Sequence, residues 1–227
     1  TASAYHSTIN GGQCNINDSC FSTIGGGFCN NVICCSEYSA IVGGFNNLIG
    51  CCSPYSTIVN GDNNCMFASD YSSITYGRCN CMNCANNHSH IFSGVCNSMY
   101  YAASSSILNG QCNKVCSAGD ILGGCRNYAF GLTFGTILGG GYNEACSSVT
   151  AAILGGECNT LFCSNHSILG SGRCNALSCS CYSSVLSGCC NRIVCSVGSF
   201  IGSGSNNYIA ADSVRSFIGS GCVNTNY

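Results

Sequence analysis

The sequence predicts an all-β protein, a β-solenoid or β-roll of about 14 coils with about 16 residues and two short strands in each coil. Three observations lead to this prediction. A short motif recurs along nearly the whole chain, its period is too short for pairs of helices, and the composition disfavours helices. Of the 227 residues, 30 are Gly, 25 are Cys and only 6% are charged, so the helix formers Glu, Lys, Arg and Gln are scarce.

The repeat is an aliphatic residue followed by Gly three positions later and by Asn six positions later. With the aliphatic residue at position 0, the 14 anchors are Ile9, Ile24, Ile41, Ile58, Ile74, Ile91, Ile107, Ile121, Ile137, Ile153, Leu169, Val185, Ile201 and Ile218. The glycines at position +3 are Gly12, Gly27, Gly44, Gly61, Gly77, Gly94, Gly110, Gly124, Gly140, Gly156, Gly172, Gly188, Gly204 and Gly221. The asparagines at position +6 are Asn15, Asn30, Asn47, Asn64, Asn80, Asn97, Asn113, Asn127, Asn143, Asn159, Asn175, Asn191, Asn207 and Asn224. Successive anchors lie 14 to 17 residues apart, so we expect one repetitive domain over residues 1–227.

Each position of the repeat predicts a local structure. Helical repeats need roughly 33–47 residues, whereas about 16 residues suit two strands of about five residues and two tight turns. Because side chains alternate along a strand, position −2 (mostly Ser), position 0 and position +2 are expected to face the interior. The Gly at +3 is expected to open a turn with a positive φ angle. The Asn at +6 is expected to start the second strand and to hydrogen-bond from coil to coil as a structural ladder, and an apolar residue at +8 completes a thin core.

The outward position +1 is apolar in many coils, although a monomeric roll would place polar residues there. Its large apolar members are Val42, Val59, Phe92, Leu108, Leu122, Leu138, Leu154 and Leu186. A strand that is apolar on both faces is typical of one buried on both sides. The sequence therefore predicts an oligomer interface with further copies of the chain, either in a closed trimer or by lateral packing into a filament; closed symmetry is the more common outcome.

A resemblance supports the trimer. The units Ser39-Ala40-Ile41-Val42-Gly43-Gly44 and Ala151-Ala152-Ile153-Leu154-Gly155-Gly156 resemble the head repeats of trimeric autotransporter adhesins. They are also similar to the Gly- and Asn-rich repeats of phage tail fibres that precede an intramolecular chaperone. The period here is longer than that of the adhesin heads, and neither family is usually so rich in Cys. The resemblance covers residues 5–227 and implies a homotrimeric rod that presents a surface for attachment.

The cysteines follow the repeat and leave three interpretations open. Five coils pair a Cys at +5 with one at +10: Cys29–Cys34, Cys79–Cys84, Cys158–Cys163, Cys174–Cys179 and Cys190–Cys195. A disulfide within each coil is one hypothesis, although strict alternation points the two side chains to different sides of the strand. Free thiols that act as small apolar fillers in stacked ladders are the second. Zinc binding is the third, but the sequence lacks a second Cys or His pair at the spacing of a zinc site.

His88 and His90 are weak candidates for a metal site, because two imidazoles two residues apart share one face of a strand. The competing interpretation is a surface slot for a ring at position −3, which holds His6, Tyr38, Tyr55, Tyr71, His88 and His166. No metal and no cofactor is predicted.

Charge and patterning exclude several function classes. Six Lys and Arg residues cannot form the basic stripe of a nucleic-acid binder, and no apolar run approaches the ~18–20 residues of a membrane helix. The eight Asp and Glu residues are scattered, so no enzyme is predicted. We expect a structural and attachment module, a rod-like trimeric fibre or adhesin head on a virion surface or in another extracellular place, that binds copies of itself and a host receptor or glycan. The alternatives are a self-assembling extracellular filament or coat protein, and an ice-binding solenoid, which lacks a regular rank of Thr.

Overall fold

The computed structural model describes residues 1–227, which form an all-β protein with no helix. Its 28 strands make 14 coils, two strands in each, and the coils repeat about every 16 residues, which confirms the predicted β-solenoid. The chain divides into two compact units, Thr1–Ser117 and Ala118–Tyr227, and each contains seven coils of the same kind. The expectation of a single domain stays a prediction.

In unit 1 the coils form two parallel sheets, one from the first strand of each coil and one from the second. The first strands are β1 (Thr8–Ile9), β3 (Thr23–Ile24), β5 (Ala40–Ile41), β7 (Thr57–Ile58), β9 (Ser73–Ile74), β11 (His90–Ile91) and β13 (Ser106–Ile107). The second strands are β2 (Ile16–Asn17), β4 (Asn31–Val32), β6 (Leu48–Ile49), β8 (Cys65–Phe67), β10 (Cys81–Asn83), β12 (Ser98–Tyr100) and β14 (Lys114–Cys116).

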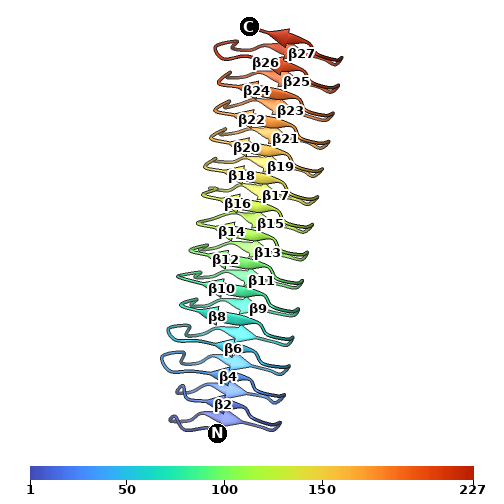
Figure 1. Cartoon of the computed structure of the whole chain (residues 1–227). Helices are drawn as coiled ribbons and strands as arrows, with labels where there is room; N and C mark the ends of the chain where they lie inside the picture. Colours follow the sequence, from blue (N-terminus) through green and yellow to red (C-terminus); the bar gives the residue numbers. More distant parts are fainter. The chain divides into compact units, whose positions relative to one another are not determined.

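Unit 2 repeats this arrangement. Its first strands are β15 (Asp120–Ile121), β17 (Thr136–Ile137), β19 (Ala152–Ile153), β21 (Ile168–Leu169), β23 (Ser184–Val185), β25 (Phe200–Ile201) and β27 (Phe217–Ile218). Its second strands are β16 (Tyr128–Phe130), β18 (Glu144–Cys146), β20 (Thr160–Phe162), β22 (Ala176–Ser178), β24 (Arg192–Val194), β26 (Tyr208–Ile209) and β28 (Thr225–Asn226). Within each unit, successive coils lie one upon the next (Figure 1).

The pairing register places equivalent residues of neighbouring coils side by side. Ile41 of β5 pairs with Ile58 of β7, and Met66 of β8 pairs with Met82 of β10. Because parallel strands lie about 4.8 Å apart, every position of the repeat becomes a ladder. The two apolar ladders at positions 0 and +8 form the core, and in both units most of their side chains are completely buried.

The strands contain two or three residues, shorter than the five we expected, because the chain turns soon after the anchor. The expectation that position +2 faces the interior is wrong. Tyr76 occupies that position and its side chain is 53% exposed. The next residue, Gly77, has φ +114°, so the backbone has already entered the turn.

Many coils also bend at non-glycine residues with positive φ. In one coil of unit 2 they are Cys174 (φ 55°), Cys179 (φ 51°) and Tyr182 (φ 57°). This conformation costs an L-residue roughly 1–2 kcal/mol. Each of the three backbone N–H groups donates a hydrogen bond of 2.9 Å to a carbonyl of the preceding coil, and these bonds offset the cost.

Each coil has two ends, and each end carries buried polar residues. The glycine–asparagine turn is positions +3 to +6, and the serine corner is positions −5 to −2. In the coil of Ile41 the buried polar residues are Asn47 in the turn and Ser36 and Ser39 in the corner. Polar ladders therefore lie between the apolar ones, and their hydrogen bonds satisfy backbone groups that the narrow coil cannot expose to water.

Candidate functional site

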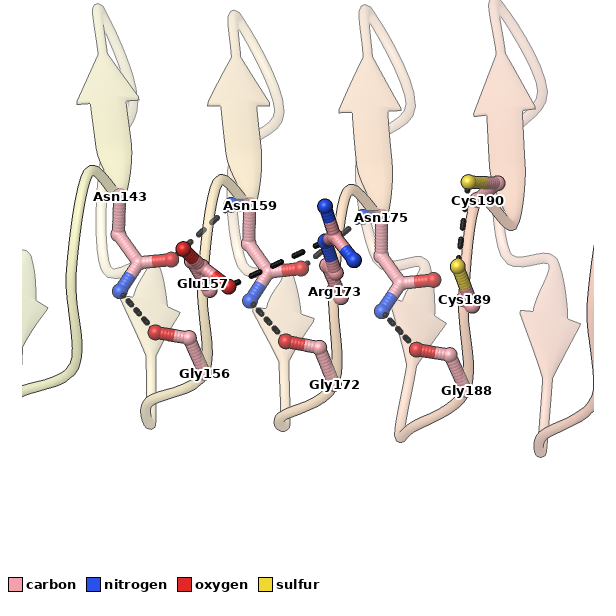
Figure 2. A network of polar contacts seen from close by, with 10 residues as sticks. All are labelled: Asn143, Gly156, Glu157, Asn159, Gly172, Arg173, Asn175, Gly188, Cys189 and Cys190. Atoms are coloured by element: carbon pink, nitrogen blue, oxygen red, sulfur yellow. Dashed lines mark hydrogen bonds and ion pairs between the residues drawn. The ribbon is translucent and has the colours of Figure 1, made fainter.

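The glycine–asparagine turn is a closed network of backbone and amide groups. The Nδ2 of Asn159 donates to the carbonyl oxygen of Gly155 at 2.9 Å and to that of Gly172, in the next coil, at 3.1 Å. Its Oδ1 accepts a hydrogen bond of 3.0 Å from the backbone N–H of Asn175. Figure 2 shows the contacts between coils, which recur at Asn143, Asn159 and Asn175. The amide is fully engaged, so its role is structural and it offers no group for chemistry.

Two features of the turn require glycine at position +3: the backbone conformation and the close contact with the next coil. Gly156 has φ +86°, a conformation that favours a residue without a side chain. A Cβ on Gly156 would also overlap the carbonyl oxygen of Gly172 and approach Nδ2 of Asn159 to 2.6 Å. Gly155, one residue earlier, has no atom within 4 Å of its Cβ position. The repeat thus keeps Gly where two backbones meet.

The predicted interface residues directly follow the first strands and are exposed, apart from Val59, which is half-buried. In unit 1, Val42, Phe92 and Leu108 are exposed. In unit 2 the equivalent residues are 39–47% exposed, and they are Leu122, Leu138, Leu154 and Leu186. The first three of these follow one another in consecutive coils, so they make an unbroken row of leucines, here called the leucine row.

A second exposed row in unit 1 is made of aromatic rings at position −3 and is here called the aromatic row. Its rings stack nearly parallel, with centroid distances of 4.8 to 5.1 Å and interplanar angles of 4° to 13°, in the order Phe21, Tyr38, Tyr55, Tyr71 and His88. In unit 2 the corresponding stack is a single pair, His166 and Tyr182, at 5.0 Å. The recurrence of rings at one position was the sequence signal for this feature.

The two candidate metal ligands have other partners. His88 stacks on Tyr71 in the aromatic row. His90 lies in β11, where its Nδ1 is 2.8 Å from the hydroxyl of Ser73, and burial followed by the charge of His88 lowers the pKa of His90. No group of three or more His, Cys, Asp or Glu side chains is arranged to hold a metal ion.

All 25 cysteines are free thiols, and none of the five predicted pairs is joined. The reason is distance. Cys29 and Cys34 lie at opposite ends of the segment that contains strand β4 (Asn31–Val32), and a strand advances about 3.3 Å per residue, whereas a disulfide needs Cα atoms within about 7 Å. Thiols instead meet thiols of neighbouring coils: the Sγ atoms of Cys34 and Cys51 are 3.6 Å apart, and Cys65 pairs in register with Cys81.

Charged groups are few, and none of them is buried. Glu157 and Arg173 form an ion pair of 3.9 Å on consecutive coils of unit 2, with side chains 58% and 70% exposed (Figure 2). Such a pair contributes little to stability. In the same unit Arg126 lies over the ring of Tyr142, 5.2 Å from its centroid. A hollow on the first coil is lined by Ile9, Gly12 and Asn15, among others.

Comparison with known proteins adds no family. No family model matches the chain, and no curated protein matches it. No helix in the structure is long and apolar enough to cross a bilayer. The resemblance to adhesin heads and tail fibres therefore rests on the repeat motif alone, and the exposed rows are the features from which a function is argued.

Proposed function

We propose that this chain is a structural and attachment module, a coiled segment of a homotrimeric surface fibre on a virion or a cell. The observation that carries the proposal is the exposed leucine row, Leu122, Leu138 and Leu154. In-register coils bring these side chains about 4.8 Å apart along the sheet, so they act as one apolar stripe. Large contiguous apolar patches on soluble proteins mark interaction sites.

The partner that fits this stripe best is another copy of the same chain. Only 6% of the residues are charged and the formal net charge is −2, so two copies meet with little electrostatic repulsion. A closed ring of copies would bury the stripe of each one, and closed symmetry is the usual form of homo-oligomers. A trimer of this kind is also what the motif resemblance implies.

The attachment role follows from repetition. A fibre with several identical surfaces binds a multivalent target more tightly than a single surface does, because later contacts are intramolecular. In unit 1 the aromatic row offers exposed ring edges for a receptor or a glycan. An enzymatic role is not proposed, since every polar ladder is used for backbone hydrogen bonds and no nucleophile, base and orienting group converge.

The test is the native mass of the chain, measured with and without reductant by light scattering. We expect a species of three times the chain mass of 23.4 kDa that reductant does not change. In the variant Leu138→Ser with Leu154→Ser, we expect this species to fall to a monomer. The matched control is Phe130→Ser with Phe162→Ser, which alters two residues of similar exposure on the second strands of the same unit.

The measured mass decides between the trimer and the filament. Open-ended polymers would replace the trimer by the filament alternative. A monomeric wild-type chain with the far-ultraviolet circular dichroism of a β protein would overturn both, and so would a trimer that the leucine substitutions leave intact.

A further inference from the structure

The fold brings cysteine thiols of neighbouring coils close together, and the proposed function makes no use of these reactive groups. Cys34 and Cys51 lie at equivalent places in consecutive coils of unit 1, just after strands β4 and β6. These strands pair in parallel register, Val32 against Ile49, which sets the spacing of the residues that follow. Both thiols are exposed, and their Sγ atoms are 3.6 Å apart.

We propose that Cys34 and Cys51 are an oxidative cross-linking site that joins one coil to the next. In the reaction the thiolate of one cysteine attacks a small disulfide such as oxidised glutathione, and one molecule of glutathione leaves. The thiolate of the other cysteine then attacks the mixed disulfide, and a second glutathione leaves. Two thiols are oxidised to one disulfide, and one disulfide is reduced to two glutathione thiols.

The geometry favours this pair over a partner in the same coil. Parallel neighbours place Cα atoms about 4.8 Å apart, inside the 4.4–6.8 Å range of disulfides, whereas Cys29 lies at the far end of β4 from Cys34. The pair is also isolated along its ladder. The following coil has Phe67 and Ala68 at this place, so that coil offers no thiol to Cys51.

A second thiol pair lies next to the first. Cys35 and Cys52 directly follow Cys34 and Cys51, and both have φ 59°, so the two coils bend alike. The charge of Cys34, then burial, then the charge of Cys52 raise the pKa of Cys35. The pKa of Cys51 is raised chiefly by its hydrogen bond with Cys34. The thiols of Cys35 and Cys51 are therefore largely protonated at neutral pH, and attack by the Cys51 thiolate should quicken by roughly tenfold per pH unit as its thiolate fraction rises.

The experiment uses the chain of residues 1–227 with Cys35→Ser and Cys52→Ser, which isolates the pair. The folded protein is treated with oxidised glutathione, remaining thiols are alkylated, and unreduced chymotryptic peptides are analysed by mass spectrometry. We expect the peptide that contains Cys34 to be linked to the one that contains Cys51, and the guanidinium midpoint to rise on oxidation. Cleavage after Tyr38 and Phe45 separates the two cysteines.

Two further substitutions in this background provide the controls. With Cys51→Ser, we expect Cys34 to be recovered without a link to another peptide, either as the mixed disulfide with glutathione or in alkylated form, and the shift of the midpoint to vanish. With Cys29→Ser, we expect the link and the shift to persist. A link between Cys29 and Cys34, a link between two chains, or a Cys34 that stays alkylatable in the folded protein would each overturn the proposal. The test does not depend on the oligomeric state, so it stands apart from the test of the fibre.

Discussion

The glycine–asparagine turn and the serine corner lie at opposite ends of each coil, and they differ in how much substitution they accept. Both carry buried polar ladders. The turn has the same Gly and Asn in all 14 copies, while the corner varies. At position −5 it holds Ser in some coils and Asn86, Ala102 or Leu132 in others, all of them buried.

The Leu132 region explains the difference. Leu132 is completely buried at a place where other coils have Ser. Glycine occupies position −2 in two coils beside it: a Cβ on Gly135 would lie 2.9 Å from the Cβ of Leu132, and one on Gly119 would lie 3.2 Å from its Cδ1. One large apolar side chain thus fills space that serine side chains fill elsewhere. Side-chain volume can be exchanged in this way, but at the +3 glycine the turn packs backbone against backbone, and that position has no side-chain volume to exchange.

The largest expected effect comes from adding one methyl group to the turn. We expect Gly156→Ala to destabilise the protein by about 4 kcal/mol, because it combines a left-handed backbone with overlap against Gly172. Gly155→Ala is the matched control and should change the free energy of unfolding by less than about 0.5 kcal/mol. Chemical denaturation of both variants measures the difference. Equal costs for the two would show that close backbone contact does not explain the turn.

The next largest effect concerns the amide. Asn159→Ala should cost about 3 kcal/mol, because it leaves the buried N–H of Asn175 and the carbonyl of Gly172 without this partner. Asn165→Ala is the control, since its Oδ1 accepts an exposed hydrogen bond of 2.8 Å from the backbone N–H of Val149. It should cost about 0.5 kcal/mol. Denaturation midpoints for the pair decide whether burial of the network sets the cost.

The corner is tested by reversing its exchange of volume. Leu132→Ser should destabilise the protein by about 3 kcal/mol, since it leaves a cavity and buries a hydroxyl. Adding Gly135→Ser, which should itself be harmful beside Leu132, is expected to recover part of that loss. A double-mutant cycle measures the coupling. Strictly additive costs would contradict the idea that these two positions share one volume.

The smallest effect should come from a single hydroxyl of the corner. Ser164 donates a hydrogen bond of 2.9 Å to the carbonyl of Phe162 and accepts one of 3.0 Å from the backbone N–H of Ser180. We expect Ser164→Ala to cost about 1 kcal/mol, because Ala adds no steric conflict and one N–H loses its partner. A loss as large as that of Asn159→Ala, measured by the same denaturation, would show that the serine and asparagine ladders contribute equally to stability, which would contradict the comparison.

The cysteines show how far the sequence carried the prediction of reactive sites. Their repeat positions, +5 and +10, could be found by counting, and the alternation of side chains already disfavoured the pair Cys29 and Cys34. The partner of Cys34 is Cys51, 17 residues away, and it touches Cys34 only because neighbouring coils stack in register. Linear spacing does not contain that contact.

The sequence by itself determined the period, the two apolar ladders and the places of Gly and Asn, because each depends on a residue type that recurs in step with the coil. Only the tertiary structure decided how short the strands are, which way position +2 points and which thiols meet. These depend on bends at residues such as Cys179 and Tyr182, whose left-handed backbone is held by hydrogen bonds from the preceding coil. The residue types at these bends do not by themselves favour a left-handed backbone, since it is the neighbouring coil, and not the local sequence, that offsets the cost.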